Sequence, residues 1–216
     1  MPAPPTLRLL TGGTTPDDIA ALRAALAERL VLRGLLTTLN GLSAPTAEDG
    51  EDRTGLPLPL LVPIAPGEEP GQVRADLARR ITRIPARTDL ILRTSGSTTG
   101  TGRLIAMSAA ALVASARATH DRLGGPGTWL LPLPAHHVAG LQILIRSLVA
   151  GTTPVVVDTS RGFSPTTLAD ALRSVRVPAG AAAGAAVGTA AGAAVSPTAG
   201  STDPRLYVSL VPTQLV

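Results

Sequence analysis

The chain has 216 residues, of which 44% are hydrophobic and 16% charged, so it can bury a substantial core and lacks the composition of a disordered protein. Its net charge of +4 comes from 19 basic residues that are all arginine, and the absence of lysine and cysteine excludes lysine-based catalysis, thiol chemistry and disulfides within these residues. Scattered arginines and an aromatic content of 1% give no indication of a nucleic-acid interface. The first residues do not resemble a signal peptide, so we expect a cytoplasmic protein.

The first predicted element is a helix that begins after Thr15. Thr15 is a suitable N-cap, and Pro16 suits the first helical turn. Apolar residues then recur at helical spacing and would form one buried face: Ile19, Leu22, Leu26 and Leu30. We therefore expect this helix to pack against a core.

The segment that follows is less regular. Residues Asn40 to Gly55 are polar, acidic and without periodicity, which predicts a surface loop. The apolar run from Leu58 to Ile64 contains two prolines, and because proline removes a backbone donor, we expect at most an edge strand there. A second helix is expected from Gly71 to Ile81.

From Asp89 onward, short apolar strands alternate with helical segments. The expected strands are Leu90–Leu92, Leu104–Ala106, Trp129–Leu133, Val155–Val157 and Tyr207–Val211. The expected helices run from Ser108 to about Leu123, from Leu141 to Val149 and from Pro165 to about Val175, with a further one opening at Pro212. This alternation predicts an α/β fold with a layered, largely parallel sheet and flanking helices.

A tract rich in Ala and Gly, residues 178–203, interrupts this alternation. Its glycines Gly180, Gly184, Gly188 and Gly192 fall four apart, a spacing found where transmembrane helices pack, but the tract lacks Leu, Ile, Phe and aromatic anchors. We expect a flexible insertion and no membrane span. The expected organisation is N-terminal helices and loops at 1–88, a core segment at 89–177, the insertion at 178–203 and the start of another strand–helix unit at 204–216.

A run of Gly, Ser and Thr after the strand at Leu90–Leu92 has the clearest chemical potential. Backbone N–H groups and hydroxyls of such a loop can surround phosphate oxygens, and an arginine at its end adds positive charge. The candidate phosphate-binding residues are Thr94, Ser95, Gly96, Ser97, Thr98, Thr99, Gly100, Gly102 and Arg103. The loop fits neither the Walker A pattern nor G-x-S-x-G. By composition alone, a polar linker remains the alternative reading.

The segment from Thr94 to Arg103 resembles the T-S-G-[ST]-T-G-x-P-K phosphate loop of the adenylate-forming acyl-CoA ligase superfamily. Three further segments look like the o-succinylbenzoate:CoA ligases, especially their short actinobacterial form: Leu133–Leu141, Ile145–Leu148 with Ala150–Gly151, and Ser209–Leu215. The loop is one residue longer than the usual pattern, and Gly102-Arg103 stands where the family commonly has Pro-Lys. The resemblance covers about Asp89 to Val175 and Leu206 to Val216, an amino-terminal portion of such an enzyme, with the same partial α/β domain.

The resemblance implies a two-step ligase of menaquinone biosynthesis. ATP, with Mg²⁺, would activate a carboxylic acid, expected to be o-succinylbenzoate, as an acyl-adenylate, and CoA would then displace AMP. The loop would hold the β- and γ-phosphates. The expected acid-binding residues are His136, His137, Gly140 and Arg146, and the main alternative for each histidine is a structural role at a strand end. A metal site at the histidine pair is not expected, because further ligands are lacking.

Arg146 lies in a predicted apolar helix, where its charge needs a partner. A substrate carboxylate and Asp158 are both candidates. The resemblance further places an adenine-site segment, an acidic ribose-binding residue and a C-terminal domain with the catalytic lysine after Val216. Two other functions stay open: an inactive nucleotide-binding remnant, and a ligase for another aryl or fatty acid.

Overall fold

The computed structural model of the protein describes residues 5–36, 38–39, 42–43, 58–94, 102–175, 186–187 and 205–214. Its helices are α1 (Pro16–Leu32), α2 (Pro70–Arg80), α3 (Ala109–Arg122), α4 (Val138–Val149) and α5 (Pro165–Ser174), with a 3₁₀ turn at Pro212–Gln214. The helices predicted between Thr15 and Val175 are confirmed, and their starts shift by only a few residues, whereas the helix predicted to open at Pro212 is a 3₁₀ turn in the described residues. No helix in this described part is long and apolar enough to cross a membrane.

The strands of the described residues form two four-stranded sheets and a small ribbon. In the first sheet the order is β1 (Leu7–Thr11), β4 (Leu60–Ile64), β5 (Leu90–Arg93) and β6 (Leu104–Met107). In the second sheet the order is β8 (Val155–Val156), β7 (Thr128–Leu131), β10 (Leu206–Val208) and β9 (Ala186–Val187), and the ribbon pairs β2 (Thr38–Leu39) with β3 (Leu42–Ser43). The second sheet is parallel throughout, whereas β6 runs antiparallel to β5 in the first. The predicted α/β fold with largely parallel sheets is confirmed.

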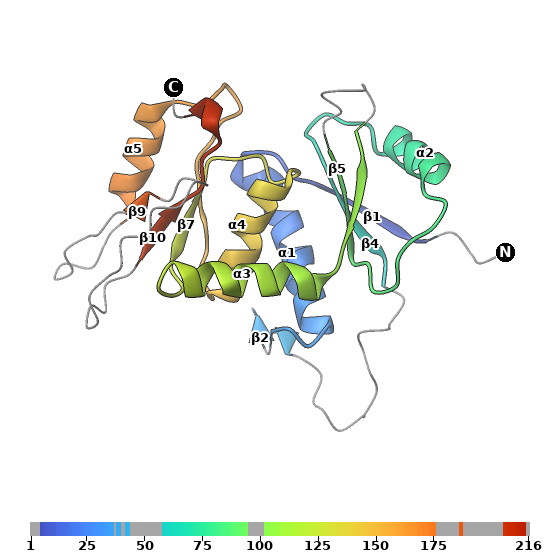
Figure 1. Ribbon diagram of the computed structural model, residues 1–216. Coiled ribbons are helices and arrows are strands. Elements are labelled where there is room, and N and C mark those ends of the chain that lie inside the picture. Colours follow the sequence, from blue (N-terminus) through green and yellow to red (C-terminus); the bar gives the residue numbers. More distant parts are fainter. Residues whose placement is uncertain are drawn as a thin grey trace.

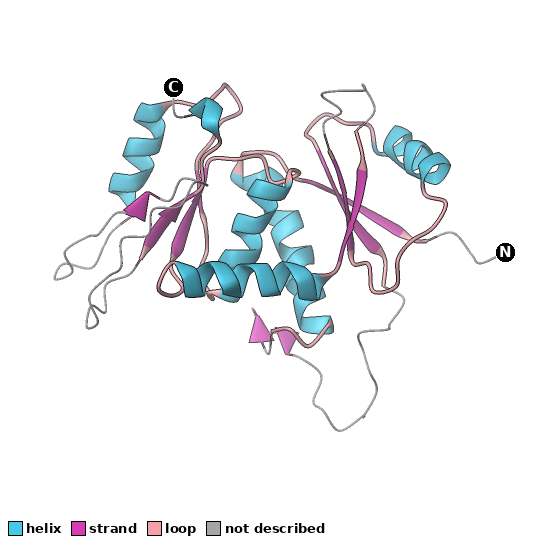
Figure 2. Ribbon diagram, in the orientation of Figure 1, coloured by secondary structure: helices cyan, strands magenta, loops and turns pink. Residues whose placement is uncertain are grey.

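The elements are stacked in five layers, which Figure 1 shows edge-on. Helices α1, α3 and α4 lie between the two sheets, while α2 covers the outer face of the first sheet and α5 the outer face of the second (Figures 1 and 2). The alternation of side chains along the strands explains this. In β5, Leu90 and Leu92 join the central core, whereas Ile91 packs in the cluster that contains Val73 and Leu77 of α2. Strands buried on both faces are typical of such layered folds.

Helix α1 follows the sequence pattern closely. The Thr15 hydroxyl accepts a hydrogen bond from the N–H of Asp18 at 3.3 Å, as the predicted N-cap requires. All four residues of the predicted apolar face are buried: Ile19, Leu22, Leu26 and Leu30. This helix therefore forms one wall of the central core.

The prediction of an edge strand at Leu58–Ile64 was wrong. Strand β4 is internal, lies between β1 and β5, and is buried at every position. Successive backbone N–H groups of a strand point to its two neighbours in turn. The N–H of Leu61 points toward β5 and donates to the carbonyl of Asp89, the residue before β5, at 3.0 Å. The nitrogen of Pro63, which carries no hydrogen, therefore faces β5 as well. On that side β4 and β5 pair through Leu61 and Leu90, two residues before Pro63. Proline is tolerated here because the ladder to β5 is short.

Two other expectations need correction or limits. Residues 42–43, inside the loop predicted at Asn40–Gly55, form β3. Strand β1 at the N-terminus was not predicted, and it pairs along its whole length with β4. Within the Ala/Gly-rich tract, the structure describes Ala186 and Val187, which pair with β10; the rest of 178–203 lies outside the described residues.

Candidate functional site

The carboxyl ends of β1 and β7 meet, and this joins the two sheets at one edge. The carbonyl of Gly12, directly after β1, accepts hydrogen bonds from the backbone N–H and the Nδ1 of His136, at 2.6 and 2.7 Å. Next to it, the Ala135 N–H donates to the Gly13 carbonyl at 3.1 Å. Ligand sites of open parallel sheets lie at carboxyl edges of this kind.

The contact fixes the ring of His136 as well as the backbone. A carbonyl oxygen can only accept, so Nδ1 of His136 carries a proton and donates it to the Gly12 carbonyl. A side chain at Gly12 would not fit, because a Cβ there would lie 2.6 Å from the His136 nitrogen. The position of His136 thus depends on a glycine more than a hundred residues away in the sequence.

A partly buried ion pair lies near His136 at this edge. The Arg93 guanidinium at the end of β5 pairs with the Glu68 carboxylate, which also accepts the Ala65 N–H at 2.7 Å. Partial desolvation raises the pKa of Glu68, but the hydrogen bonds from Arg93 and Ala65, together with the charges of Arg93 and His136, outweigh it and lower the pKa overall. The carboxylate of Glu68 therefore stays ionised at the edge where the two sheets meet.

The predicted phosphate loop is closed at its base by two hydrogen bonds. The Thr94 N–H donates to the Arg103 carbonyl at 2.9 Å, and the Arg103 N–H donates to the Thr94 hydroxyl at 2.8 Å. Both residues are exposed, and the Arg103 side chain forms no hydrogen bond or ion pair with another described residue. The candidate residues from Ser95 to Gly100 lie outside the described residues. The structure therefore places the two ends of the loop at the top of the β5–β6 hairpin.

The start of α4 holds the next predicted residues. His137 is exposed, occupies the N-cap position and makes no side-chain capping hydrogen bond. Partial desolvation, and then the adjacent His136, lower the pKa of His137, so its ring is neutral around pH 7. Gly140 is buried against the preceding turn, and a Cβ there would lie 2.4 Å from the Pro134 oxygen. Gly140 thus allows α4 to begin directly beneath the turn that carries the histidines.

Arg146 lies in the last turn of α4, away from the histidines. Its guanidinium carbon is 4.8 Å from the centre of the Trp129 ring, a cation–π contact, and desolvation lowers the pKa of Arg146. Within the described part of the chain it forms no ion pair. The prediction that Asp158 could be the partner of Arg146 is wrong. Asp158 is exposed, and its carboxylate accepts the Ser160 N–H at 2.8 Å.

Several polar atoms around Arg146 are buried without a hydrogen-bond partner. Among the described residues these include Nε2 of His120, Nε1 of Trp129 and Nε of Arg146 itself. Burial, followed by the charge of Arg146, lowers the pKa of His120, so this buried ring is neutral. An anionic ligand or an ordered water molecule next to Arg146 could supply hydrogen-bond partners for these atoms.

The predicted site residues therefore fall into separate groups. The loop ends and His136 lie at the joined carboxyl edges, His137 and Gly140 adjoin them, and Arg146 lies about 13 Å further along α4, from the helical rise of 1.5 Å per residue. Sequence reasoning missed Gly12 and Glu68. Gly12-Gly13 after the segment Leu7–Leu10, which is apolar except for Arg8, was a signal for a strand that ends at a site. Nothing in the sequence indicates the contact of Glu68 with Arg93.

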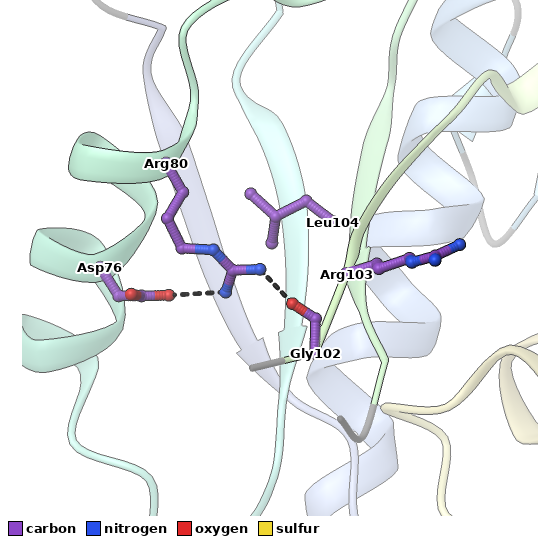
Figure 3. A pocket seen from close by; sticks show the side chains of 5 residues that line it. All are labelled: Asp76, Arg80, Gly102, Arg103 and Leu104. Carbon is purple, nitrogen blue, oxygen red and sulfur yellow. Dashed lines mark hydrogen bonds and ion pairs between the residues drawn. The ribbon is translucent and has the colours of Figure 1, made fainter. Parts of the chain in front are cut away.

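A pocket of about 700 Å³ opens on the α2 side of the loop base. It is lined by Asp76, Arg80, Gly102, Arg103 and Leu104 (Figure 3). Arg80 bridges the Asp76 carboxylate and the Gly102 carbonyl, while the Arg103 side chain extends away from them. Nowhere in the described residues are three or more His, Asp or Glu side chains grouped to hold a metal ion.

Together these features define an α/β protein with mostly parallel sheets whose candidate ligand-binding residues, apart from Arg146, lie at or next to the carboxyl edges of the strands. No family model matches the chain. It is 42% identical over 128 residues to the "Probable 2-succinylbenzoate--CoA ligase" of Mycobacterium tuberculosis, in strain CDC 1551 / Oshkosh and in strain H37Rv. This similarity confirms the resemblance to o-succinylbenzoate:CoA ligases. The match covers 56% of this chain and 33% of each relative, so the chain spans about a third of the length of these curated relatives.

Solved structures give a weaker likeness. A variant of E. coli MenE with bound OSB-AMS has a TM-score of 0.47 and 18% identity, covering 79% of this chain and 37% of that one. The o-succinylbenzoate CoA synthetase (MenE) from Bacillus subtilis, in complex with OSB-AMP, has a TM-score of 0.43 and 18% identity, covering 71% of this chain and 52% of that one.

Proposed function

We propose that the chain is the nucleotide-phosphate- and acid-binding part of an AMP-forming acid–thiol ligase. The observation that carries this proposal is that the ends of the Gly/Ser/Thr loop and the ring of His136 share the edge where the two sheets meet, linked by the Glu68–Arg93 pair. The similarity to the Mycobacterium tuberculosis protein adds support, since that protein is named as a probable 2-succinylbenzoate–CoA ligase.

The reaction would proceed in two steps. A carboxylate oxygen of the acid attacks the α-phosphorus of ATP, supplied as its Mg²⁺ complex, and the bond between the α-phosphorus and the α,β-bridging oxygen breaks, so that pyrophosphate leaves with that oxygen. The thiol of CoA then attacks the acyl carbon, loses its proton, and displaces AMP. Binding and positioning of charged groups account for most of the catalysis in phosphoryl chemistry, so the chain's contribution is a set of fixed donors and cations.

The loop residues would bind the phosphates that leave. We propose that Thr94 and Arg103, with the residues from Ser95 to Gly102, donate backbone and hydroxyl hydrogen bonds to the β- and γ-phosphates. Arg103 extends from the end of this segment and would add the charge that the family takes from lysine. Because a guanidinium binds phosphate oxygens through two parallel N–H groups, the geometry would differ from that of a lysine point charge.

The acid would lie along α4. One carboxylate of a dicarboxylic acid such as o-succinylbenzoate would bind near His136 and His137, where activation would occur. Because Arg146 begins about 13 Å further along α4, its long side chain would have to extend toward the histidines to meet the second carboxylate. The half-buried Arg146 guanidinium over Trp129 has no anionic partner in the described part of the chain, so a carboxylate would satisfy both its charge and its buried Nε. This supports a dicarboxylic acid. With the similarity to the Mycobacterium tuberculosis ligase, we propose that the acid is o-succinylbenzoate and that the chain acts in menaquinone biosynthesis, in the cytoplasm.

Isothermal titration of the chain tests both halves of the proposal. We expect heat on addition of ATP·Mg²⁺, and separately on addition of o-succinylbenzoate. Arg146→Gln should weaken binding of o-succinylbenzoate about tenfold or more and leave ATP·Mg²⁺ affinity unchanged, because a buried charged hydrogen bond is lost at one site only. Absence of ATP·Mg²⁺ binding at millimolar concentration would refute the nucleotide assignment. Equal affinity for o-succinylbenzoate and for a monocarboxylic aryl or fatty acid would refute the choice of acid.

A further inference from the structure

Helix α2 contacts the loop base from outside the central core. It is anchored to the outer face of the first sheet by Val73 and Leu77, both buried. From its last turn Arg80 donates from Nη1 to Asp76 Oδ2 at 3.0 Å, one helical turn earlier. The other Nη group donates to the carbonyl of Gly102 (Figure 3). Arg80 thus connects a rigid helix to the end of the predicted phosphate loop.

The same peptide group is held from two sides. The Gly102 carbonyl and the Arg103 N–H belong to one planar unit, so fixing its oxygen and its hydrogen fixes its orientation. Arg80 binds the oxygen, and the Thr94 hydroxyl accepts the N–H at 2.8 Å. A cation on the carbonyl also polarises the peptide and strengthens its N–H as a donor. The closed base of the loop therefore depends on Arg80 as well as on Thr94.

The other end of the loop is held from the segment that leads into α2. Arg93 directly precedes Thr94 and pairs with Glu68, whose carboxylate is fixed in turn by the Ala65 N–H at 2.7 Å. Both ends of the loop are consequently tied by arginine contacts to the region from Ala65 to Arg80. The pocket beside Arg80 is not itself an anion site, since Arg80 is already paired and Arg103 extends away from it (Figure 3).

We propose that Arg80, oriented by Asp76, is a positioning residue for nucleotide binding. This inference rests on the proposed function, because Arg80 can affect nucleotide affinity only if the loop binds phosphates. By holding the Gly102–Arg103 peptide before the ligand arrives, Arg80 removes part of the ordering entropy that binding would otherwise oppose. It touches neither the phosphates nor the acid in this arrangement and acts through the loop end alone.

The neighbouring Arg79 offers a matched control. Arg79 also pairs with Asp76, at 3.5 Å, but its side chain is 71% exposed, and it contacts Asp76 without contacting the described ends of the loop. Replacing either arginine by glutamine removes one charge from the same turn of the same helix. Only Arg80→Gln breaks the contact with Gly102.

The experiment compares the unmodified chain with Arg80→Gln, Arg79→Gln and Arg80→Lys. We expect Arg80→Gln to weaken ATP·Mg²⁺ and inorganic pyrophosphate binding about tenfold in isothermal titration, Arg79→Gln to stay within about twofold, and Arg80→Lys to recover part of the loss. Binding of o-succinylbenzoate should be the same in all four proteins. Thermal unfolding of each variant shows whether the fold is retained.

A ligand-free measurement separates this proposal from the proposed function. Amide hydrogen exchange at Arg103 and Thr94 should accelerate in Arg80→Gln and not in Arg79→Gln, whatever the ligand is. If the unmodified chain binds no ATP·Mg²⁺, the nucleotide assignment fails and amide exchange alone decides the role of Arg80. Equal exchange in the two glutamine variants, or equal loss of ATP·Mg²⁺ affinity, would overturn the positioning role.

Discussion

Replacing Asp89 by alanine should destabilise the protein strongly, because Asp89 is the centre of a buried charge cluster. Its Oδ1 accepts Nη1 of Arg29 at 3.0 Å and Nε of Arg33 at 2.8 Å, and its Oδ2 accepts the N–H of Ala109, the first residue of α3, at 2.8 Å. Asp89 is 4% exposed and Arg29 is 6% exposed. One carboxylate therefore joins β5 to α1 and α3.

The magnitude follows from what the substitution leaves behind. Arg29 keeps its buried charge and retains only carbonyl partners, those of Asp89 and Pro59. Removing one partner of a buried ion pair lowers the free energy of unfolding by about 3–5 kcal/mol. For a chain of this size, that corresponds to a melting temperature lower by roughly 6–20 °C.

Urea unfolding at pH 7, followed by far-UV circular dichroism, measures the effect. Glu28→Ala is the matched control, since Glu28 precedes Arg29 in α1 and pairs with Arg8 at 2.7 Å with both side chains nearly half exposed. An exposed pair contributes at most about 1 kcal/mol. If Asp89→Ala and Glu28→Ala lose the same free energy of unfolding within error, the cluster is not the structural centre described here.

Two further substitutions test the joined edge and the buried histidine. Gly12→Ala should lower the free energy of unfolding by about 1–3 kcal/mol, because its Cβ would lie 2.6 Å from the His136 backbone nitrogen. Gly71→Ala in α2 is the control: its Cβ has room, so it should raise the free energy of unfolding by about 0.5–1 kcal/mol. Urea unfolding of both variants measures these changes, and a neutral Gly12→Ala would contradict the geometry of the joined edge. Burial lowers the pKa of His120 below the ordinary value of about 6.5, so the unfolded chain binds more protons and stability present above that pH is lost as the pH falls below it. His120→Gln should make the loss between pH 7.5 and 5.5 smaller, as seen by unfolding at both pH values, and an unchanged slope would argue against a neutral buried ring.

The sequence predicted elements well where local signals agree. In α1 the cap, the proline and the apolar spacing all indicate the same helix, and each residue named in advance is capped or buried as expected. Local reading failed at β4, where Pro63 suggested an edge. Whether a missing N–H matters depends on the neighbouring strand, and that pairing is set by residues far away in the sequence.

The candidate site was predictable in its parts and not in its assembly. The loop and the histidines stand out by composition, but the contact of His136 with Gly12 joins residues 124 apart. Arg146 was rightly expected to need a partner, and within the described residues Trp129 supplies one through its ring face, which charge matching alone does not reveal. Contacts of this kind follow from packing of the layers.

The antiparallel pairing of β6 with β5 bears on how this loop tolerates change in length. The register from Leu90 with Met107 to Arg93 with Leu104, and the bonds between Thr94 and Arg103, are all formed by residues outside 95–101. A residue added within 95–101 therefore shifts no strand register and displaces no core side chain. The additional residue relative to the usual T-S-G-[ST]-T-G-x-P-K pattern falls between these paired ends, so the described pairing of β5 with β6 does not depend on it.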